Sequence, residues 1–159
     1  MSKNKESGQG MVLFGVLMGA LIAIGSILAI NLVVLVGQID AINDILVSAA
    51  AGGAAQSTVL PGARGLDEDR AQEVARHLLR RNLQEIPFLD APAVRIAGDA
   101  DILVIDPSPG LCEPDPFEAG VCYQSPFVTI RVVVPVRLAW GEIVLDIPMH
   151  AAAQAGQTP

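Results

Sequence analysis

The stretch GMVLFGVLMGALIAIGSILAINLVVLVG, residues 10–37, decides how the rest of the chain is organised. It contains no charged residue, and its only clearly polar side chains are those of Ser26 and Asn31. A helix needs about 20 apolar residues to cross the roughly 30 Å hydrocarbon core of a bilayer. Because this stretch is longer than that, it predicts a transmembrane helix over residues 11–37 that tilts or extends out of the lipid.

The charges on the two sides of this stretch differ in sign. Lys3 and Lys5 lie in the N-terminal tail, residues 1–10, whereas the first charges after the stretch are Asp40 and Asp44. Since cytoplasmic flanks are enriched in Lys and Arg, we expect a cytoplasmic tail and an extracytoplasmic C-terminal domain. A cleaved signal has an apolar core of about 7–15 residues, so this longer run predicts an uncleaved signal anchor in the cytoplasmic (inner) membrane, with membrane lipid as a partner.

Small residues recur within the anchor at helical spacing. Gly15, Gly19 and Ala23 follow one another at intervals of four, a small-xxx-small ladder that lets another transmembrane helix approach closely. This ladder predicts helix–helix association with a partner in the membrane. The alternative is that these residues reflect only the general abundance of glycine in membrane helices.

The apolar pattern continues beyond the anchor in alternating steps of four and three. It comprises Leu35, Ile39, Ile42, Leu46, Ala49 and Gly53. This spacing makes a narrow apolar seam on a helix, and it predicts a helical extension outside the membrane over residues 38–56. The seam needs a cover, either from the chain's own domain or from another subunit.

The remaining residues predict a small extracytoplasmic domain, so the chain is α+β. Residues 57–66 are rich in Pro and Gly and predict a linker. Residues 67–150 are then expected to fold with one helix, capped by Asp67 and stopped by Pro87, followed by an antiparallel sheet of about four strands. Residues 151–159 are expected to be a flexible tail. The expected strands are residues 94–96, 102–105, 128–138 and 143–149.

The two longest of these strands are expected to form an antiparallel hairpin. Apolar residues alternate with polar ones through both, and a turn is expected at Trp140 and Gly141. Pro135 and Pro148 lie on the outward phase and remove donors from the ladder, so edges or bulges are expected there.

Cys112 and Cys122 are the only cysteines in the chain. In an extracytoplasmic domain, a pair at this separation predicts a disulfide that closes a proline-rich loop. A metal site that uses His150 and nearby acids is the alternative, but it lacks any recognised ligand spacing.

Composition and motifs argue against several function classes. The net charge of −7 and the aromatic content of 4% disfavour nucleic-acid binding. The chain has no Walker loop, dinucleotide fingerprint, nucleophile elbow or HExxH. Asp99, Asp101 and Asp106 match no calcium-loop pattern and are expected to be turn acids. We therefore expect no enzyme activity, no cofactor and no small-molecule substrate.

The opening of the chain resembles a known family. Residues 6–14, ESGQGMVLF, are similar to the E-x-G-Q-x-x-V-x-F opening of TadE/TadG-like pilus-assembly proteins. In that family an apolar helix and an alanine-rich segment follow, as in residues 44–55, DILVSAAAGGAA. The resemblance covers residues 6–56 and implies a pilin-like structural or assembly component of a pilus or secretion apparatus, the tight-adherence (Flp pilus) system.

One position differs from the pilin pattern. Pilin-like precursors that are cut after a glycine carry glutamate five residues into the mature chain, and the fifth residue after Gly10 is Gly15. This difference favours an alternative, a single-span accessory subunit of a larger inner-membrane complex, respiratory or photosynthetic. In both hypotheses the partners are other transmembrane helices or subunits.

Overall fold

One long helix, α1 (Lys5–Ala54), occupies the first third of the chain. The computed structural model describes residues 5–60, 63–108, 110–138 and 143–156. The chain divides into two compact units, Met1–Gly37 and Gln38–Pro159, so that α1 contributes to both.

The part of α1 that belongs to the first unit has an apolar surface that the chain itself leaves uncovered. Met11, Leu21 and Leu28 are 80%, 56% and 65% exposed, and their large apolar neighbours are similar. Both polar side chains donate within the helix, Ser26 Oγ to the Ile22 carbonyl and Asn31 Nδ2 to the Ile27 carbonyl, whereas Asn31 Oδ1 has no hydrogen-bond partner among the described residues. Beginning at Met11, α1 is long and apolar enough to cross a bilayer.

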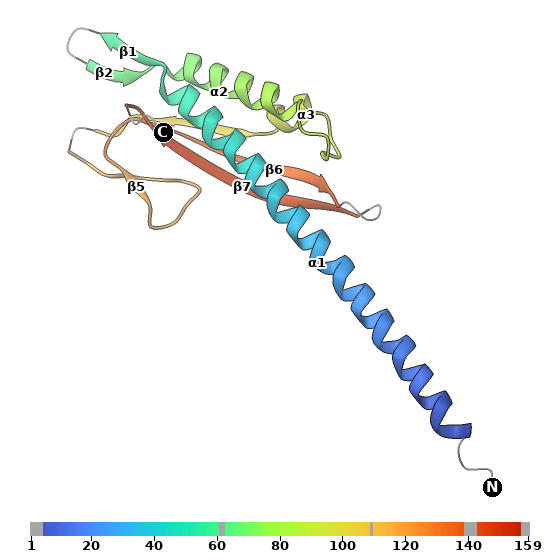
Figure 1. The fold of residues 1–159 in the computed structure, drawn as a ribbon. Helices are drawn as coiled ribbons and strands as arrows, with labels where there is room; N and C mark the ends of the chain where they lie inside the picture. The colour runs from blue at the N-terminus through green and yellow to red at the C-terminus, as the bar shows by residue number, and fades with distance from the viewer. Residues whose placement is uncertain (1–4, 61–62, 109, 139–142, 157–159) are drawn as a thin grey trace. The chain divides into compact units, whose positions relative to one another are not determined.

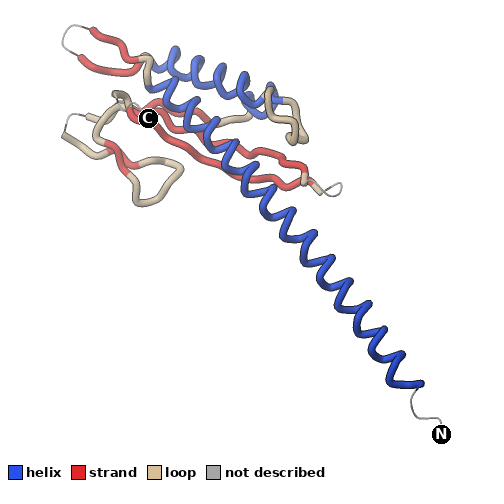
Figure 2. Tube along the Cα trace, viewed as in Figure 1, coloured by secondary structure: helices blue, strands red, loops and turns tan. Residues whose placement is uncertain are grey.

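The second unit is built on an antiparallel sheet. Strands β3 (Asp101–Ile105), β6 (Phe127–Arg137) and β7 (Val144–Gln154) pair in the order β3-β6-β7. The end of α1 and helix α2 (Glu68–Leu83) lie together over one face of this sheet (Figures 1 and 2). The α+β class and the antiparallel sheet are confirmed, but this sheet has three strands where about four were expected.

Helix α2 has the features that the sequence predicts. Asp67 is its N-cap, and its carboxylate accepts a hydrogen bond from the Arg70 N–H at 3.2 Å. Acids fill the first turn and arginines the last, which suits the helix dipole. Its buried face consists of residues four apart: Ala71, Ala75, Leu79 and Leu83.

The core lies between the helices and the sheet, and α1 lies very close to both α2 and β6 at Gly53. A Cβ atom built on Gly53 lies 2.9 Å from the Ala71 carbonyl oxygen, 3.1 Å from the Ala75 Cβ and 3.4 Å from Val128 Cγ1. The small residues on both helices therefore set the distance between α1, α2 and β6.

Replacing Gly53 with valine is expected to destabilise the second unit by about 2–3 kcal/mol, because the added atoms overlap backbone that cannot move aside cheaply. Denaturant unfolding of the detergent-solubilised chain, followed by circular dichroism, measures this. Gly98→Ala is the matched control, since a Cβ there meets nothing within 4 Å. Equal stability of the two variants would contradict the packing described.

Two segments depart from the expected secondary structure. Residues 57–60 and 63–66 form two paired antiparallel strands, β1 (Ser57–Leu60) and β2 (Ala63–Leu66), where a linker was expected. Residues 94–96 lie in a helix, α3 (Ala93–Gly98), instead of a strand. The apolar positions of α3 follow helical spacing, and Pro92 provides its N-cap.

The C-terminal hairpin has the expected pairing and extends further than expected. Strand β7 continues to Gln154, because Ala151 is buried and residues 151–154 pair with the start of β6, so this part of the expected tail is ordered. The turn expected at Trp140 and Gly141 lies outside the described residues.

The prolines of this hairpin need no bulge, because the register is continuous through both. Pro148 lies on β7, an edge strand, and Pro135 lies on β6 beyond the last pair with β3. There the Pro135 carbonyl accepts a hydrogen bond from the Asp90 N–H at 3.0 Å, so the neighbouring segment completes the edge.

Candidate functional site

The ladder residues of the anchor lie on an open surface of the helix. A Cβ added at Gly15 or Gly19 meets nothing within 4 Å, and Ala23 is exposed. These residues leave room for a second helix, as a small-xxx-small face does.

The seam residues divide between the two units. Ile42 and Leu46 have no exposed surface, whereas Leu35 and Ile39 are half-buried. The chain's own second unit therefore covers the seam from Ile42 onward, and that part of it is not available to another subunit.

The predicted disulfide is present and closes a loop outside the main sheet. Cys112 and Cys122 are joined, with their Cα atoms 5.6 Å apart. Two short strands, β4 (Glu113–Pro114) and β5 (Cys122–Tyr123), pair at the base of this loop. We call residues 111–123 the disulfide loop.

A buried polar cluster connects the disulfide loop to the sheet. The Asp115 side chain is fully buried, and its carboxylate accepts a hydrogen bond from the Phe117 N–H at 2.9 Å. Thr129 of β6 contacts the same carboxylate at 3.3 Å, and His150 Nε2 of β7 lies 3.2 Å from it. The Phe117 N–H and the Thr129 hydroxyl thus donate to one buried carboxylate, and the His150 imidazole lies beside it, which lowers the cost of burying the carboxylate.

The hydrogen bond between Thr129 and His150 depends on which ring nitrogen of His150 carries the proton. Thr129 Oγ1 lies 2.8 Å from His150 Nε2. If Nε2–H donates to that oxygen, the threonine hydroxyl is free to donate to Asp115. On the other side of the ring, Nδ1 lies 3.5 Å from Glu118 Oε2.

A hydroxyl, an imidazole and carboxylates in contact also occur in catalytic triads, but the exposure differs here. Thr129 is 0% exposed, so a substrate cannot reach its oxygen. Nucleophilic catalysis requires a nucleophile that touches the substrate. The contacts of the cluster hold the disulfide loop on the sheet. Within the described residues, no group of three His, Cys, Asp or Glu side chains is placed to hold a metal ion.

Asp115→Ala is expected to cost about 2–4 kcal/mol, because it leaves buried donors without an acceptor. Denaturant unfolding of the solubilised chain measures the loss. Glu118→Ala is the control, since the Glu118 side chain is 55% exposed and its contact with His150 is worth at most about 1 kcal/mol. A loss of unfolding free energy in Asp115→Ala no larger than that in Glu118→Ala would contradict the role of Asp115 in holding the disulfide loop on the sheet.

Tyr123 is the last residue of the disulfide loop, and the pKa of its phenol depends on its surroundings there. Burial, then the charges of Asp115 and Glu118, raise the pKa of its phenol above the ordinary value of 10.0. The neutral phenol is therefore favoured in the folded state. This contribution to stability is complete below the ordinary pKa and is lost as the pH rises through the folded pKa.

The chain has one tyrosine, so tyrosinate absorbance titrates Tyr123 alone. The midpoint is expected to lie above that of the denatured chain, and Asp115→Asn is expected to lower it without removing the whole shift, since burial is the larger cause. A midpoint equal to that of the denatured chain would contradict the burial of this ring.

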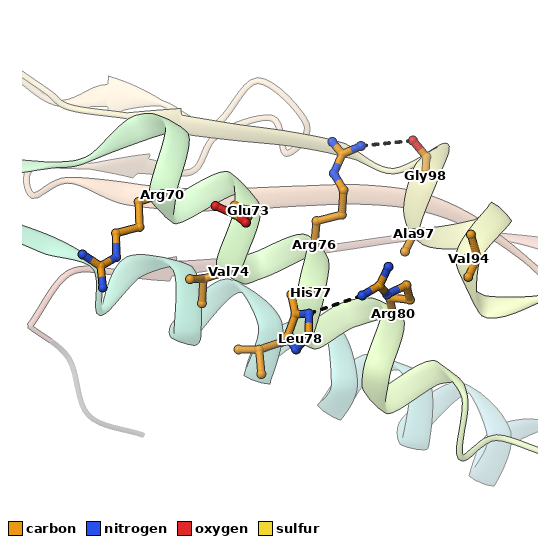
Figure 3. Close-up of a pocket in the computed structure, with 10 residues that line it drawn as sticks. All are labelled: Arg70, Glu73, Val74, Arg76, His77, Leu78, Arg80, Val94, Ala97 and Gly98. Carbon is orange, nitrogen blue, oxygen red and sulfur yellow. Dashed lines mark hydrogen bonds between the residues drawn. The ribbon is translucent and has the colours of Figure 1, made fainter.

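A second feature is a groove between α2 and α3 of about 610 Å³ (Figure 3). We call it the α2–α3 groove. Its lining residues on α2 are Arg70, Glu73, Val74, Arg76, His77, Leu78 and Arg80, and those on α3 are Val94, Ala97 and Gly98.

Positive charge dominates this groove in a chain that is acidic overall. Arg76 donates to the Gly98 carbonyl at 3.3 Å and joins the two helices, and Arg80 contacts His77 Nδ1 at 3.4 Å. Among the described residues, none of the three arginines lies within ion-pair distance of a carboxylate. Unpaired guanidinium groups beside apolar side chains suit an anionic, partly apolar ligand.

The α2–α3 groove was not predicted from the sequence. The signal that was available is the spacing of Arg70, His77 and Arg80, in steps of seven and three, which places their side chains along one side of a helix. The opposite wall was not predictable, because residues 94–96 were assigned to a strand. The buried cluster was missed because Asp115, Thr129 and His150 come together only through the register of β6 and β7.

Comparisons of the chain with protein-family models, with curated proteins and with solved structures find no match in any of the three.

Proposed function

We propose that the protein is a non-enzymatic, single-pass membrane protein whose anchor, residues 11–37, holds an extracytoplasmic α+β domain at the cytoplasmic membrane. The observation that carries this proposal is the row of large apolar side chains that α1 exposes between Met11 and Val36. Such a surface is covered in the cell by lipid or by other apolar helices. The charge difference between the two flanks supports an inward N-terminus.

Within this class, we propose a TadE/TadG-like, pilin-like role as a structural or assembly component of a pilus or secretion apparatus. The ESGQGMVLF opening at residues 6–14 supports this role. The continuity of α1 from Lys5 to Ala54 also supports it, because the anchor and the core of the domain then share one helix.

The alternative is a single-span accessory subunit of a larger inner-membrane complex, respiratory or photosynthetic. Gly15 favours it, because a pilin-like chain cut after Gly10 carries glutamate at that position. The open ladder of Gly15, Gly19 and Ala23 suits packing against a partner helix in either role.

One experiment separates the two roles. Membranes are solubilised in mild detergent, the tagged protein is isolated, its N-terminal residue is determined, and the proteins that accompany it are identified. Recovery with pilus components is the expected result, and a chain that begins at Met11 would add evidence of pilin-like processing. An intact Met1 in a stoichiometric enzyme complex would overturn the pilus role in favour of the accessory subunit.

A further inference from the structure

The two outer arginines of the α2–α3 groove are too far apart for one small anion to bind both. Arg70 and Arg80 are ten residues apart on α2, about 15 Å along the helix axis, so one phosphate or carboxylate group reaches only one of them. Between them the groove is lined by Leu78 and Val94, and Val94 is 59% exposed. The occupant that fits is a chain segment with acidic and apolar side chains.

The disulfide loop has that chemistry on its outer surface. Leu111 is 60% exposed, and the Glu113 side chain is exposed and has no partner among the described residues. The Glu118 side chain is 55% exposed, and one of its oxygens lies 3.5 Å from His150 Nδ1. Glu113 is therefore the carboxylate of the loop that is most available to a second copy.

The loop is also held in shape before it binds anything. The Cys112–Cys122 disulfide closes it, and buried Asp115 fastens it to the sheet. A segment that is already ordered loses little conformational entropy on binding, so a modest number of contacts gives useful affinity.

The groove and the loop of one chain lie on different sides of its sheet. Val128 approaches α1 at Gly53, and the next residue, Thr129, contacts Asp115 of the loop. Since successive side chains of a strand point to opposite faces, the helices cover one face and the loop packs on the other. The groove between α2 and α3 therefore belongs to the helix layer, and the chain's own loop does not occupy it.

We propose that the α2–α3 groove of one copy of this chain binds the disulfide loop of a second copy, with Arg70 and Arg80 facing the loop carboxylates and Leu111 against the apolar lining. The proposal rests on the assembly role proposed above and gives it a contact. Because the two surfaces differ, the contact is heterologous and joins copies head to tail into a row or ring.

Charge reversal in full-length chains tests this contact. Two differently tagged copies are co-expressed, extracted in mild detergent and purified through one tag, and the recovery of the other is measured. All copies carry Gly15→Leu and Gly19→Leu, so that association through the anchor does not mask the contact. The groove variant is Arg70→Glu with Arg80→Glu, and the loop variant is Glu113→Arg.

When both tagged copies carry the groove variant, or both carry the loop variant, the recovery of the second copy is expected to fall at least about tenfold, since like charges then face each other. A groove variant mixed with a loop variant restores opposite charges at both contacts, and its recovery is expected to return. The matched control, Arg81→Glu with Arg95→Glu, changes two exposed arginines outside the groove and is expected to recover normally.

The proposal is overturned if the mixed pair fails to recover, if the control loses as much as the groove variant, or if the groove variant loses a different protein while its own copies stay associated. The assembly role can fail separately. A groove variant that remains in the membrane with pilus components but loses its second copy would support both proposals, whereas loss of the second copy in a preparation without pilus components would contradict only the assembly role.

Discussion

Replacing Leu46 with aspartate is expected to unfold the second unit of the chain. Leu46 is 0% exposed and lies on the buried part of the seam. The change removes a buried leucine and places a carboxylate where no partner is available, at a combined cost of more than about 4 kcal/mol. Since small domains are stable by about 5–15 kcal/mol, this loss approaches the whole stability.

Val47→Asp is the matched control, because Val47 is the next residue of α1 and is 39% exposed. Resistance to proteolysis in detergent is the measurement, with the Leu46 variant expected to be digested and the Val47 variant to remain resistant. Equal resistance of both variants would mean that the seam is not covered by the chain's own domain.

Replacing Leu21 and Ile24 with arginine is expected to release the protein from the membrane. Both side chains are 56% exposed on the apolar part of α1. Each arginine near the centre of a spanning helix costs about 3 kcal/mol relative to an apolar residue, so the pair costs about 6 kcal/mol.

Extraction of membranes at alkaline pH measures this effect. The wild-type chain and the control, Leu21→Val with Ile24→Val, are expected to stay in the membrane pellet. The arginine variant is expected to leave it or to be degraded before insertion. An arginine variant that stays as firmly in the pellet as the control would argue that α1 is not the anchor.

The sequence predicted well wherever a long pattern decides the structure. Many residues carry the pattern in the apolar run from Met11 and in the alternation of β6. The cap at Asp67 depends on a specific local hydrogen bond. Residues 94–96 show the limit, because three residues carry too little periodicity to separate a strand from a turn of helix.

The candidate sites were harder to predict because they depend on contacts between distant segments. Asp115 contacts Thr129, which lies 14 residues further along the chain. It lies beside His150 only because β6 pairs with β7. The disulfide could be predicted, since two cysteines have a single possible pairing. The α2–α3 groove could not be predicted because one of its walls is α3, a six-residue helix where a strand was expected.

We expect residues 11–37 to cross the membrane once and to place the α+β domain outside the cytoplasm. Protease protection in intact spheroplasts and in inverted vesicles, with separate tags at the two ends of the chain, measures this topology. The C-terminal tag is expected to be lost from spheroplasts while the N-terminal tag survives, and inverted vesicles are expected to give the opposite result. A C-terminal tag that is protected in spheroplasts and digested in inverted vesicles would contradict this topology.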